Sequence, residues 1–368
     1  MSSSQNDRRQ FRGNLYETKS SYTIISKHTI SALRINPRYE VKNCFYQFIE
    51  TSKTRRGRTV IATENFTLKC VPPFSFNLSA SLFSNGDAQI RRFQDGKFRQ
   101  VICIDGQLVL TTVEDSGTID NPRISVKLES NRMISSVMKN HATTIIEALF
   151  DIKFNPKPFY QQASKDRILK KAIRNLWGLR IPSTATVFEA LLDSIIEQQI
   201  SLDVAHVLET NVVKTFGDIL KLDDREYFAY PTPKRLSSAN IKQLRSCGLS
   251  TKKAEYLIEI SKLIRDGKLN LEDYRNYTDT EKIIEELDKI RGIGVWTAEL
   301  TIARSMHRYD TIPADDLGLR RVIAHYYCHD KKITGKEARK IAEKWGRWKG
   351  LASFYLIIAE ATEKTHAQ

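Results

Sequence analysis

The chain has 368 residues, 41% of them hydrophobic, which is enough for two or three compact domains with cores of their own. Its formal net charge is +15, and a surplus of this size favours a polyanionic partner, with nucleic acid ahead of a membrane surface. The sequence contains no run of about 18 apolar residues, the length that crosses a bilayer, so we expect no membrane span.

Residues 1–40 are polar, mixed in charge and without periodicity, and they are predicted to form a flexible tail. They lack the apolar stretch of a secretory signal, which favours an intracellular location. The cysteines stand far apart, and this spacing argues against a structural zinc site or an iron–sulfur cluster. They are Cys44, Cys70, Cys103, Cys247 and Cys328.

Residues 41–150 are predicted to form a mixed α/β lobe around an antiparallel sheet. Several segments between residues 66 and 130 alternate apolar and polar residues or are rich in β-branched types. We expect strands at residues 66–71, 88–93, 98–104, 107–114 and 123–129. Asn85-Gly86 and Asp95-Gly96 are typical of hairpin turns, and residues 75–83 fit a short helix.

Residues 151–368 are predicted to form an all-α lobe, because apolar residues recur there at spacings of three and four. Residues 178–217 hold two helices, and the first buries a face made of Phe188, Leu191, Leu192, Ile195 and Ile196. Further helices are expected within residues 237–248, 250–267, 278–292, 295–306 and 316–327, with two more towards the C-terminus. Gly267 is a helix stop, and Thr278 with Glu281 fits a capping box. The fold class is therefore α+β.

The segment LDKIRGIGVWTAEL joins two helices through Gly292, Ile293 and Gly294. Glycine allows positive φ and close approach of a partner, and the second helix begins with unpaired N–H groups at the positive end of its dipole. Such amides can hold a DNA phosphate without reading a base. A turn that binds nothing explains the two glycines about equally well, so the surrounding residues must decide.

These surroundings resemble the helix–hairpin–helix DNA glycosylase superfamily, and are most similar to its 3-methyladenine DNA glycosylase II branch. The resemblance rests on residues 287–306 and 310–323, and residues 149–166, 188–201 and 248–264 extend it. It covers residues 140–360 and, more weakly, the sheet lobe before them. It implies an N-terminal sheet lobe followed by an all-α helix–hairpin–helix glycosylase lobe, with a catalytic aspartate and the hairpin on one wall of a cleft. No cofactor or catalytic metal is expected, and a metal ion at the hairpin turn is left open.

The segment IPADDLGLRR places Asp315 and Asp316 directly before an amphipathic run. Cleaving a base from deoxyribose gives the sugar oxocarbenium character, which a nearby carboxylate stabilises while water attacks. The spacing of the apolar residues that follow matches the family's catalytic aspartate to Asp316, and leaves Asp315 as a cap or supporting residue. Both aspartates also suit plain helix N-caps.

The resemblance assigns the other site residues in the same way. Gly292, Ile293, Gly294 and Thr297 would contact the DNA backbone, and Trp296 and Leu300 would line the base pocket. Gln199, or else Gln198, would fill the gap left by a flipped base, although both also suit the solvent-facing end of a helix.

At two positions this sequence lacks an aromatic residue that the family carries in its base pocket. Leu300 and Ile357 stand where the best-known members carry a Tyr and a Trp, which leaves the substrate range open. Other aromatic residues near the C-terminus, Trp345, Trp348 and Phe354, are expected to pack in the core. Four cations are expected to be solvated, with phosphate contacts as the alternative: Arg320, Arg321, Arg347 and Lys349.

Superfamily members that also cut the strand carry a lysine where this chain has Trp296, and Lys252 and Lys253 are predicted to lie on the surface of another helix. We therefore predict a monofunctional glycosylase that hydrolyses the bond to a damaged, alkylated purine and leaves an abasic site. Its partner would be double-stranded DNA with damaged bases, and the protein would act as a monomer, inside the cell and associated with DNA.

Two other readings stay open. An 8-oxoguanine-type glycosylase has a similar two-lobed plan, and a non-catalytic protein could use the hairpin as a phosphate clamp alone. The endonuclease III-like branch is disfavoured because the cysteines do not cluster.

Overall fold

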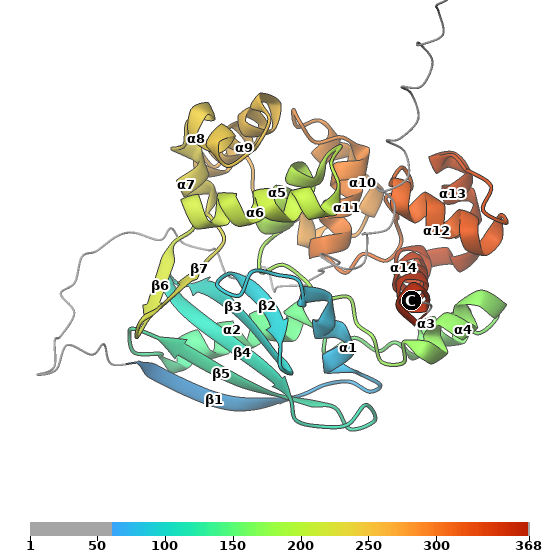
Figure 1. Ribbon diagram of the computed structural model, residues 1–368, viewed down its shortest axis with the longest axis horizontal. Helices are drawn as coiled ribbons and strands as arrows, with labels where there is room; N and C mark the ends of the chain where they lie inside the picture. Colours follow the sequence, from blue (N-terminus) through green and yellow to red (C-terminus); the bar gives the residue numbers. More distant parts are fainter. Residues whose placement is uncertain (1–60, 367–368) are drawn as a thin grey trace, which may run out of the picture.

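The computed structural model describes residues 61–366, which form a sheet lobe and a larger helical lobe (Figure 1). The predicted tail at 1–40, the first part of the predicted sheet lobe at 41–60 and Cys44 lie outside the described residues. Within the described part, no helix has the length and apolar character needed to cross a membrane.

The five-stranded sheet has the order β1-β5-β4-β3-β2, and all neighbouring strands are antiparallel. The strands are β1 Ala62–Lys69, β2 Arg91–Gln94, β3 Lys97–Ile104, β4 Gln107–Asp115 and β5 Arg123–Ser130. Asp95-Gly96 joins β2 to β3, with φ of 53° and 72°, as a tight two-residue hairpin turn requires. The predicted sheet and this turn are confirmed.

The predicted short helix at 75–83 is confirmed as α1 Phe76–Ala80 and η1 Ser81–Phe83. The predicted hairpin turn at Asn85-Gly86 is wrong, because this pair follows η1 and does not connect two paired strands. Helix α2 Ser136–Leu149 covers one face of the sheet, where Ala142 and Ile146 share a buried core with Phe98 and Val126.

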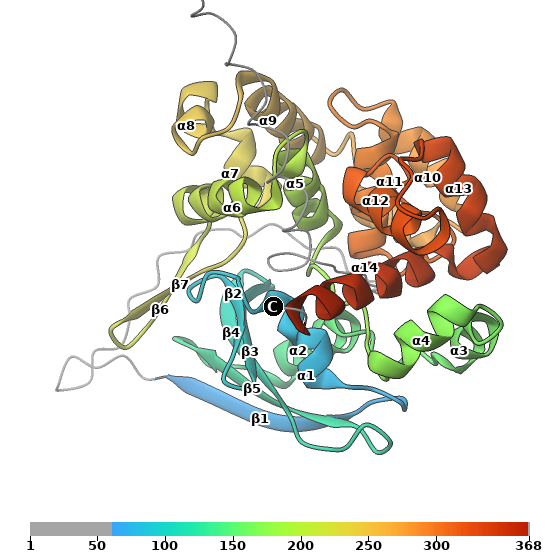
Figure 2. The same ribbon diagram turned by 45° about the vertical axis from the view of Figure 1, so that its right-hand side comes forward.

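The remaining helices pack around two further cores (Figure 2). The first core is built mainly by α5 Val187–Glu197, α6 Leu202–Phe216, α7 Pro233–Ser237, α8 Ile241–Ser246, α9 Thr251–Arg265, η2 Leu271–Asn276, α10 Thr280–Asp288 and α11 Val295–Ser305. The second is built by α3 Lys157–Ala163, α4 Arg167–Asn175, α12 Leu317–Tyr327, α13 Gly335–Ala342, η3 Glu343–Trp348 and α14 Lys349–His366. Helix α11, which carries Trp296 and Leu300, and helix α12, which begins after Asp316, therefore belong to different cores.

Two local predictions about helix ends have different outcomes. Gly267 follows α9 with a φ of +68°, which confirms it as the stop. The capping box at Thr278 is wrong, because Asp279 is the N-cap of α10 and its side chain accepts the N–H of Glu281. The amide of Glu281 is therefore capped as predicted, but by the residue that follows Thr278.

The helical lobe also contains a small β-hairpin that the sequence pattern did not indicate. Strands β6 Ile219–Leu222 and β7 Arg225–Phe228 pair with each other, and Leu220 and Leu222 pack against Val101 and Leu110 of the sheet. The hairpin therefore joins the first helical core to the sheet lobe.

Candidate functional site

The hairpin between α10 and α11 is fixed by one buried residue and one indispensable glycine. Ile293 is 3% exposed and packs into the core shared by the surrounding helices. Gly292 has a φ of +94°, and a Cβ there would lie 2.2 Å from Cγ of Tyr256. Since only glycine combines this conformation with so close a neighbour, Gly292 is required by the turn itself.

Gly294 is the N-cap of α11 and leaves this helix end open. Its backbone is extended, with φ −96° and ψ 173°, and no side chain accepts a hydrogen bond from the first turn. The N–H groups of that turn have no acceptor within the helix and lie at the positive end of its dipole. Gly294 and Val295 are both exposed, so this helix end can accept an anion such as a phosphate.

Gln198, at the C-terminal end of α5, is bonded to the hairpin. Its Nε2 donates to the carbonyl oxygen of Gly292 at 2.9 Å and to Oγ1 of Thr297 at 3.0 Å. Thr297 is 2% exposed and its hydroxyl accepts from Gln198, so its contact with DNA stays a prediction. Gln199 is exposed, with a φ of +57°, at the turn between α5 and α6. The geometry thus separates the two wedge candidates, because Gln198 is engaged inside the protein and Gln199 projects outward.

Asp316 is the N-cap of α12, and its Oδ1 accepts the N–H of Leu319 at 2.7 Å. The side chain is half-buried, and the neighbouring Leu317 is 74% exposed, so the carboxylate lies at the molecular surface. Asp315 does not cap α12; it lies against the start of α13, where a Cβ on Gly335 would come within 2.0 Å of its Oδ1.

An ion pair between a buried carboxylate and a partly exposed guanidinium holds the Asp316 loop to α11. Glu299, on α11, is 1% exposed and its Oε1 accepts from Nη1 of Arg339, on α13, at 2.6 Å. The same Arg339 nitrogen donates to the carbonyl oxygen of Ile312 at 3.4 Å, and Thr311 Oγ1 donates to Glu299 at 3.3 Å. Burial raises the pKa of the Glu299 carboxyl, and the Arg339 guanidinium opposes that rise. Helix α11 and the segment that leads to Asp316 are therefore tied together through α13.

A second buried pair joins α11 to α5, where Arg304 Nη2 lies 2.7 Å from Glu197 Oε2. Next to it, Lys253 donates from Nζ to the carbonyl oxygen of Ile196 at 2.7 Å, and burial lowers the pKa of this amine. The prediction that Lys253 is a surface residue is wrong, since it is 8% exposed; Lys252 is exposed as expected. Lys253 satisfies a carbonyl in the last turn of α5, two residues before the first of the two glutamines.

The sheet lobe also contributes to this support through Arg91 on β2. Its Nη2 donates to the Tyr230 hydroxyl at 2.8 Å and lies 3.5 Å from both Asp193 and Glu209. Burial raises the pKa of Asp193 well above its usual range. This network ties β2 to α5 and α6, and therefore to the segment that ends in Gln198.

Trp296 and Leu300 lie one turn apart on α11 and are both half-buried. They share one helix face, as the predicted base pocket requires. Trp345 and Phe354 are 3% exposed and belong to the second helical core, which confirms their predicted packing role. Trp348 and Ile357 are half-buried against the same core.

Of the four cations expected to be solvated or near phosphate, two have carboxylate partners. Arg321 Nη2 lies 2.8 Å from Glu360, and Lys349 Nζ lies 2.6 Å from Glu343. Arg347 is stacked over the Trp348 ring at 4.7 Å. These contacts leave less charge for DNA than the sequence suggests.

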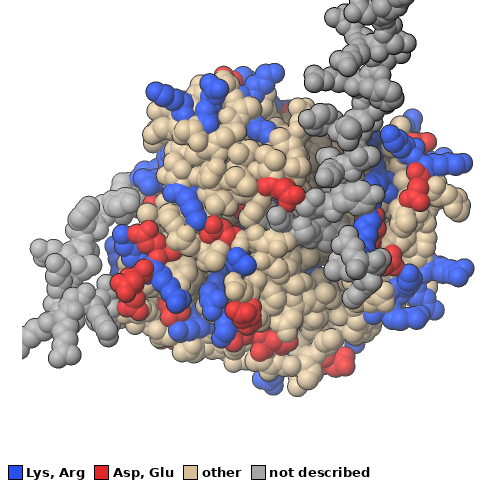
Figure 3. Space-filling view, in the orientation of Figure 1, with Lys and Arg blue, Asp and Glu red and all other residues tan. Residues whose placement is uncertain are grey.

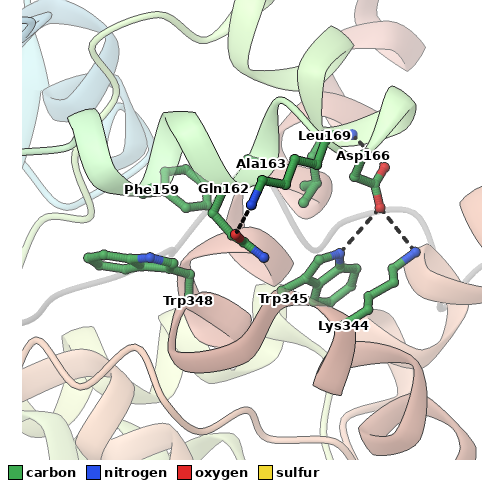
Figure 4. A pocket seen from close by; sticks show the side chains of 9 residues that line it. Phe159, Gln162, Ala163, Asp166, Leu169, Lys344, Trp345 and Trp348 are labelled. Carbon is green, nitrogen blue, oxygen red and sulfur yellow. Dashed lines mark hydrogen bonds and ion pairs between the residues drawn. The ribbon is translucent and has the colours of Figure 1, made fainter.

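A separate small pocket of about 170 Å³ lies between α3 and η3 (Figure 4). Trp345 and Trp348 line it together with Phe159, and Asp166 at its edge bonds Lys344 at 3.0 Å and Nε1 of Trp345 at 3.4 Å. Among the described residues that line it there is neither Asp316 nor any residue of the hairpin. The described residues also contain no group of three or more His, Cys, Asp or Glu side chains suited to a metal ion.

Residues 192–347 match the HhH-GPD superfamily of base excision DNA repair proteins. The chain is 32% identical over 241 residues to a DNA-3-methyladenine glycosylase of Bacillus subtilis, covering 65% of this chain and 78% of that protein. It is similar to a solved 3-methyladenine DNA-glycosylase from Archaeoglobus fulgidus, with a TM-score of 0.72 and 26% identity over 81% of this chain and 98% of that one.

A solved 8-oxoguanine glycosylase/lyase of Clostridium acetobutylicum shares the fold, with a TM-score of 0.65 at 23% identity over 83% of this chain and 98% of that one. The fold, the geometry of the hairpin and the similar proteins all indicate the same family. The chain belongs to the HhH-GPD superfamily of base excision DNA repair proteins and is a DNA glycosylase, as the resemblance predicted.

Proposed function

We propose that the protein is a monofunctional DNA glycosylase that releases alkylated purines from double-stranded DNA and leaves an abasic site. The observation that carries this proposal is the half-buried carboxylate of Asp316 at the start of α12, in a loop that the Glu299–Arg339 pair ties to the hairpin helix. The substrate class follows the relatives, since the Bacillus subtilis and Archaeoglobus fulgidus proteins are both named 3-methyladenine DNA glycosylases.

In the proposed reaction, the open end of α11 holds one phosphate while Asp316 faces the sugar of a flipped nucleotide. The bond between C1′ and the base nitrogen breaks, and its electron pair leaves with the base. The sugar gains oxocarbenium character, which a carboxylate stabilises electrostatically. Water then adds its oxygen to C1′ and loses a proton to the base or to solvent, which gives free base and an abasic site.

The hydrogen bonding of Asp316 indicates which oxygen would face the sugar. Its Oδ1 accepts from the Leu319 amide, whereas Oδ2 has no partner among the described residues. The Leu319 amide and the positive end of the α12 dipole both lie at this carboxylate. Oδ2 is therefore the oxygen assigned to the developing cation.

Water is the nucleophile in this proposal because no lysine is suitably placed on α11. Trp296 stands where a lysine would attack C1′, and the nearby Lys253 is buried and bonded to a main-chain carbonyl. Borohydride, which traps Schiff bases, should give no covalent enzyme–DNA adduct. A trapped adduct would contradict the monofunctional assignment.

The wedge is assigned to Gln199 and a positioning role to Gln198. Gln199 is exposed at the turn after α5, and a long side chain there can fill the space of an extruded base. Trp296 offers an aromatic face on which an electron-poor alkylated base would stack by cation–π attraction. Leu300, one turn further along α11, would form the apolar wall beside it.

The test is a panel of duplexes, each with one lesion, incubated with purified full-length protein and with Asp316→Asn. Free bases are identified by chromatography, and abasic sites are revealed as breaks after heating in alkali. Release of 3-methyladenine or 7-methylguanine that depends on Asp316 supports the proposal. Preferential release of 8-oxoguanine would support the alternative branch, and binding without release would leave only a phosphate clamp.

A further inference from the structure

Helix α4 carries a row of basic side chains on its exposed face. Arg167, Lys170, Lys171 and Arg174 are spaced at three and four residues, so they lie on the same side of the helix. All four are exposed, whereas Leu169 and its neighbours on the opposite face are buried in the second helical core. Figure 3 shows these positive side chains gathered at the lower right, where Figure 1 places α4.

These side chains border a groove of about 910 Å³ between α4, α12 and α14. Its floor is largely apolar and includes Ile168, Ala172, Tyr326 and Ala359. The volume lies in the range of about 300–1,000 Å³ that is usual for ligand sites. The groove is therefore a concave, cation-rimmed surface that the glycosylase reaction does not use.

The two carboxylates beside the groove neutralise only one of the four cations on its rim. Asp166 is already bonded to Lys344 and to the Tyr327 hydroxyl, both at 3.0 Å. Glu363 lies 2.7 Å from Lys171 and accepts from the Tyr326 hydroxyl at 3.0 Å. Within residues 61–366, the three remaining cations of α4 form no ion pair. They are Arg167, Lys170 and Arg174.

The groove lies at the opposite end of α12 from the proposed catalytic carboxylate. Asp316 caps the start of α12, and Tyr326 stands ten residues further along the chain, near the end of the helix. At 1.5 Å per residue this separates the two sites by roughly 15 Å along the helix axis. A ligand in the groove is therefore not the base or sugar that meets Asp316.

We infer that this groove is a docking site for an acidic amphipathic segment of another protein. The unpaired cations spread over roughly 10 Å of helix, which is seven steps of about 1.5 Å from Arg167 to Arg174, and they complement carboxylates along one side of such a segment. The apolar floor complements its apolar side, as in complexes where a helix lies in a groove. A nucleic acid backbone would use the cations but would leave the apolar floor uncovered, so the protein partner is favoured.

The test uses the full-length protein and two fluorescein-labelled synthetic peptides with the same number of glutamates. The first has leucines at helical spacing on the face opposite the glutamates, and the second has serines in their place. Fluorescence anisotropy should show that the leucine peptide binds at least about fivefold more tightly, because only it covers the floor. Equal affinity for both peptides, or no binding of the leucine peptide below 100 μM, would overturn the inference.

A charge-matched pair of variants locates the binding. Arg167→Ala/Lys170→Ala/Arg174→Ala should weaken the leucine peptide about tenfold, because it removes the unpaired rim. The control Lys97→Ala/Lys127→Ala/Lys153→Ala removes the same charge from lysines that already pair with Glu114, Glu129 and Glu147, and should change binding less than twofold. Base release and duplex affinity should stay within about twofold in both variants.

Two outcomes of this pair would contradict the inference. Equal loss of peptide binding in both variants would mean that net charge alone attracts the peptide. Loss of duplex affinity in the α4 variant alone would assign the row to nucleic acid instead. Thermal unfolding of both variants serves as the folding check, since all six side chains lie at the surface.

Discussion

The starts of α11 and α12 are two helix N-termini treated in opposite ways. At α11 the N-cap is Gly294, and no side chain accepts from the first turn. At α12 the N-cap is Asp316, whose carboxylate accepts the Leu319 amide. Both helix ends present the same positive dipole, but the first leaves it for a ligand and the second matches it with a fixed anion. The side chain at the N-cap, not the helix, decides whether a helix start binds phosphate or holds a carboxylate.

The largest effect should follow from removing the anion at α12. Asp316→Asn keeps an N-cap, so the fold is expected to survive, but it removes the charge that we propose faces the sugar. We expect the single-turnover rate of base release to fall roughly 100- to 1,000-fold, the usual scale for loss of one preorganised electrostatic contact. Duplex affinity should not weaken, because the change removes an anion that repels phosphate.

Asp315→Asn is the matched control for that experiment. Asp315 is exposed and lies against the start of α13, so its charge should matter less than threefold to base release. If the two variants lose activity equally, the catalytic assignment to Asp316 fails.

The start of α5 extends the comparison, because burial is the largest influence on the pKa of the carboxylate there. Glu189, in the first turn of α5, accepts the Ala185 N–H at 3.1 Å and is 8% exposed. Burial raises its pKa to about 7, against the favourable field of Arg91, and the carboxylates of Glu272 and Glu209 add to the rise. Burial therefore makes this carboxylate costly to ionise.

The stability consequence has a definite sign. The folded protein holds the Glu189 proton up to about pH 7, whereas the unfolded chain loses it near 4.5. The contribution of Glu189 to the unfolding free energy therefore falls by about 2 kcal/mol as pH rises from 5 to 8. Glu189→Gln cannot ionise, so denaturant unfolding should show its stability relative to wild type rising by that amount over the same range. A pH-independent difference would mean that Glu189 stays ionised in the fold.

The features of the fold and site that can be predicted from the sequence are those that depend on residues close together in the chain. Asp95-Gly96 and Gly267 are recognisable because a turn or a helix stop depends on the φ of one or two residues. The position of Trp296 and Leu300 on one face of α11 also follows from their spacing. These features need no knowledge of what packs against them.

The supports of the site had no such signal. Glu299 and Arg339 are 40 residues apart in the chain, and Arg91 and Asp193 are separated by 102, so only the tertiary fold pairs them. Lys253 was misplaced because charge suggested a surface residue, although it shares a helix face with the buried Leu257. The strands β6 and β7 have four residues each, too few for an alternating pattern to stand out.

A capping side chain at position 294 would make the start of α11 resemble the start of α12. Gly294 has an extended backbone and a Cβ there would meet nothing within 4 Å, so Gly294→Asp should fold and cap the helix. The new carboxylate would occupy the amides and repel phosphate, and duplex affinity should fall about tenfold. Gly294→Ser caps the helix without the charge and should lose less. Unchanged affinity in the aspartate variant would show that this helix end does not hold DNA.

The smallest effect on base release is expected from removing the hydrogen bonds that join Gln198, at the end of α5, to the hairpin. Gln198→Ala leaves the Gly292 carbonyl and the Thr297 hydroxyl without their donor, so the hairpin should hold DNA in a less favourable position. We expect base release to slow about fivefold under single-turnover conditions. Gln198→Glu should do no better, because an ionised carboxylate cannot donate either bond.

A lesion that is already unpaired separates this role from that of a wedge. Gln199→Ala should slow release from a fully paired duplex but not from a lesion in a bulge, because a bulged base needs little help to leave the stack. The defect of Gln198→Ala should persist on the bulge, since the phosphate next to the lesion must still be held by the displaced hairpin. If the bulge relieves both variants equally, Gln198 acts as part of the wedge and its bonds to the hairpin are incidental to catalysis.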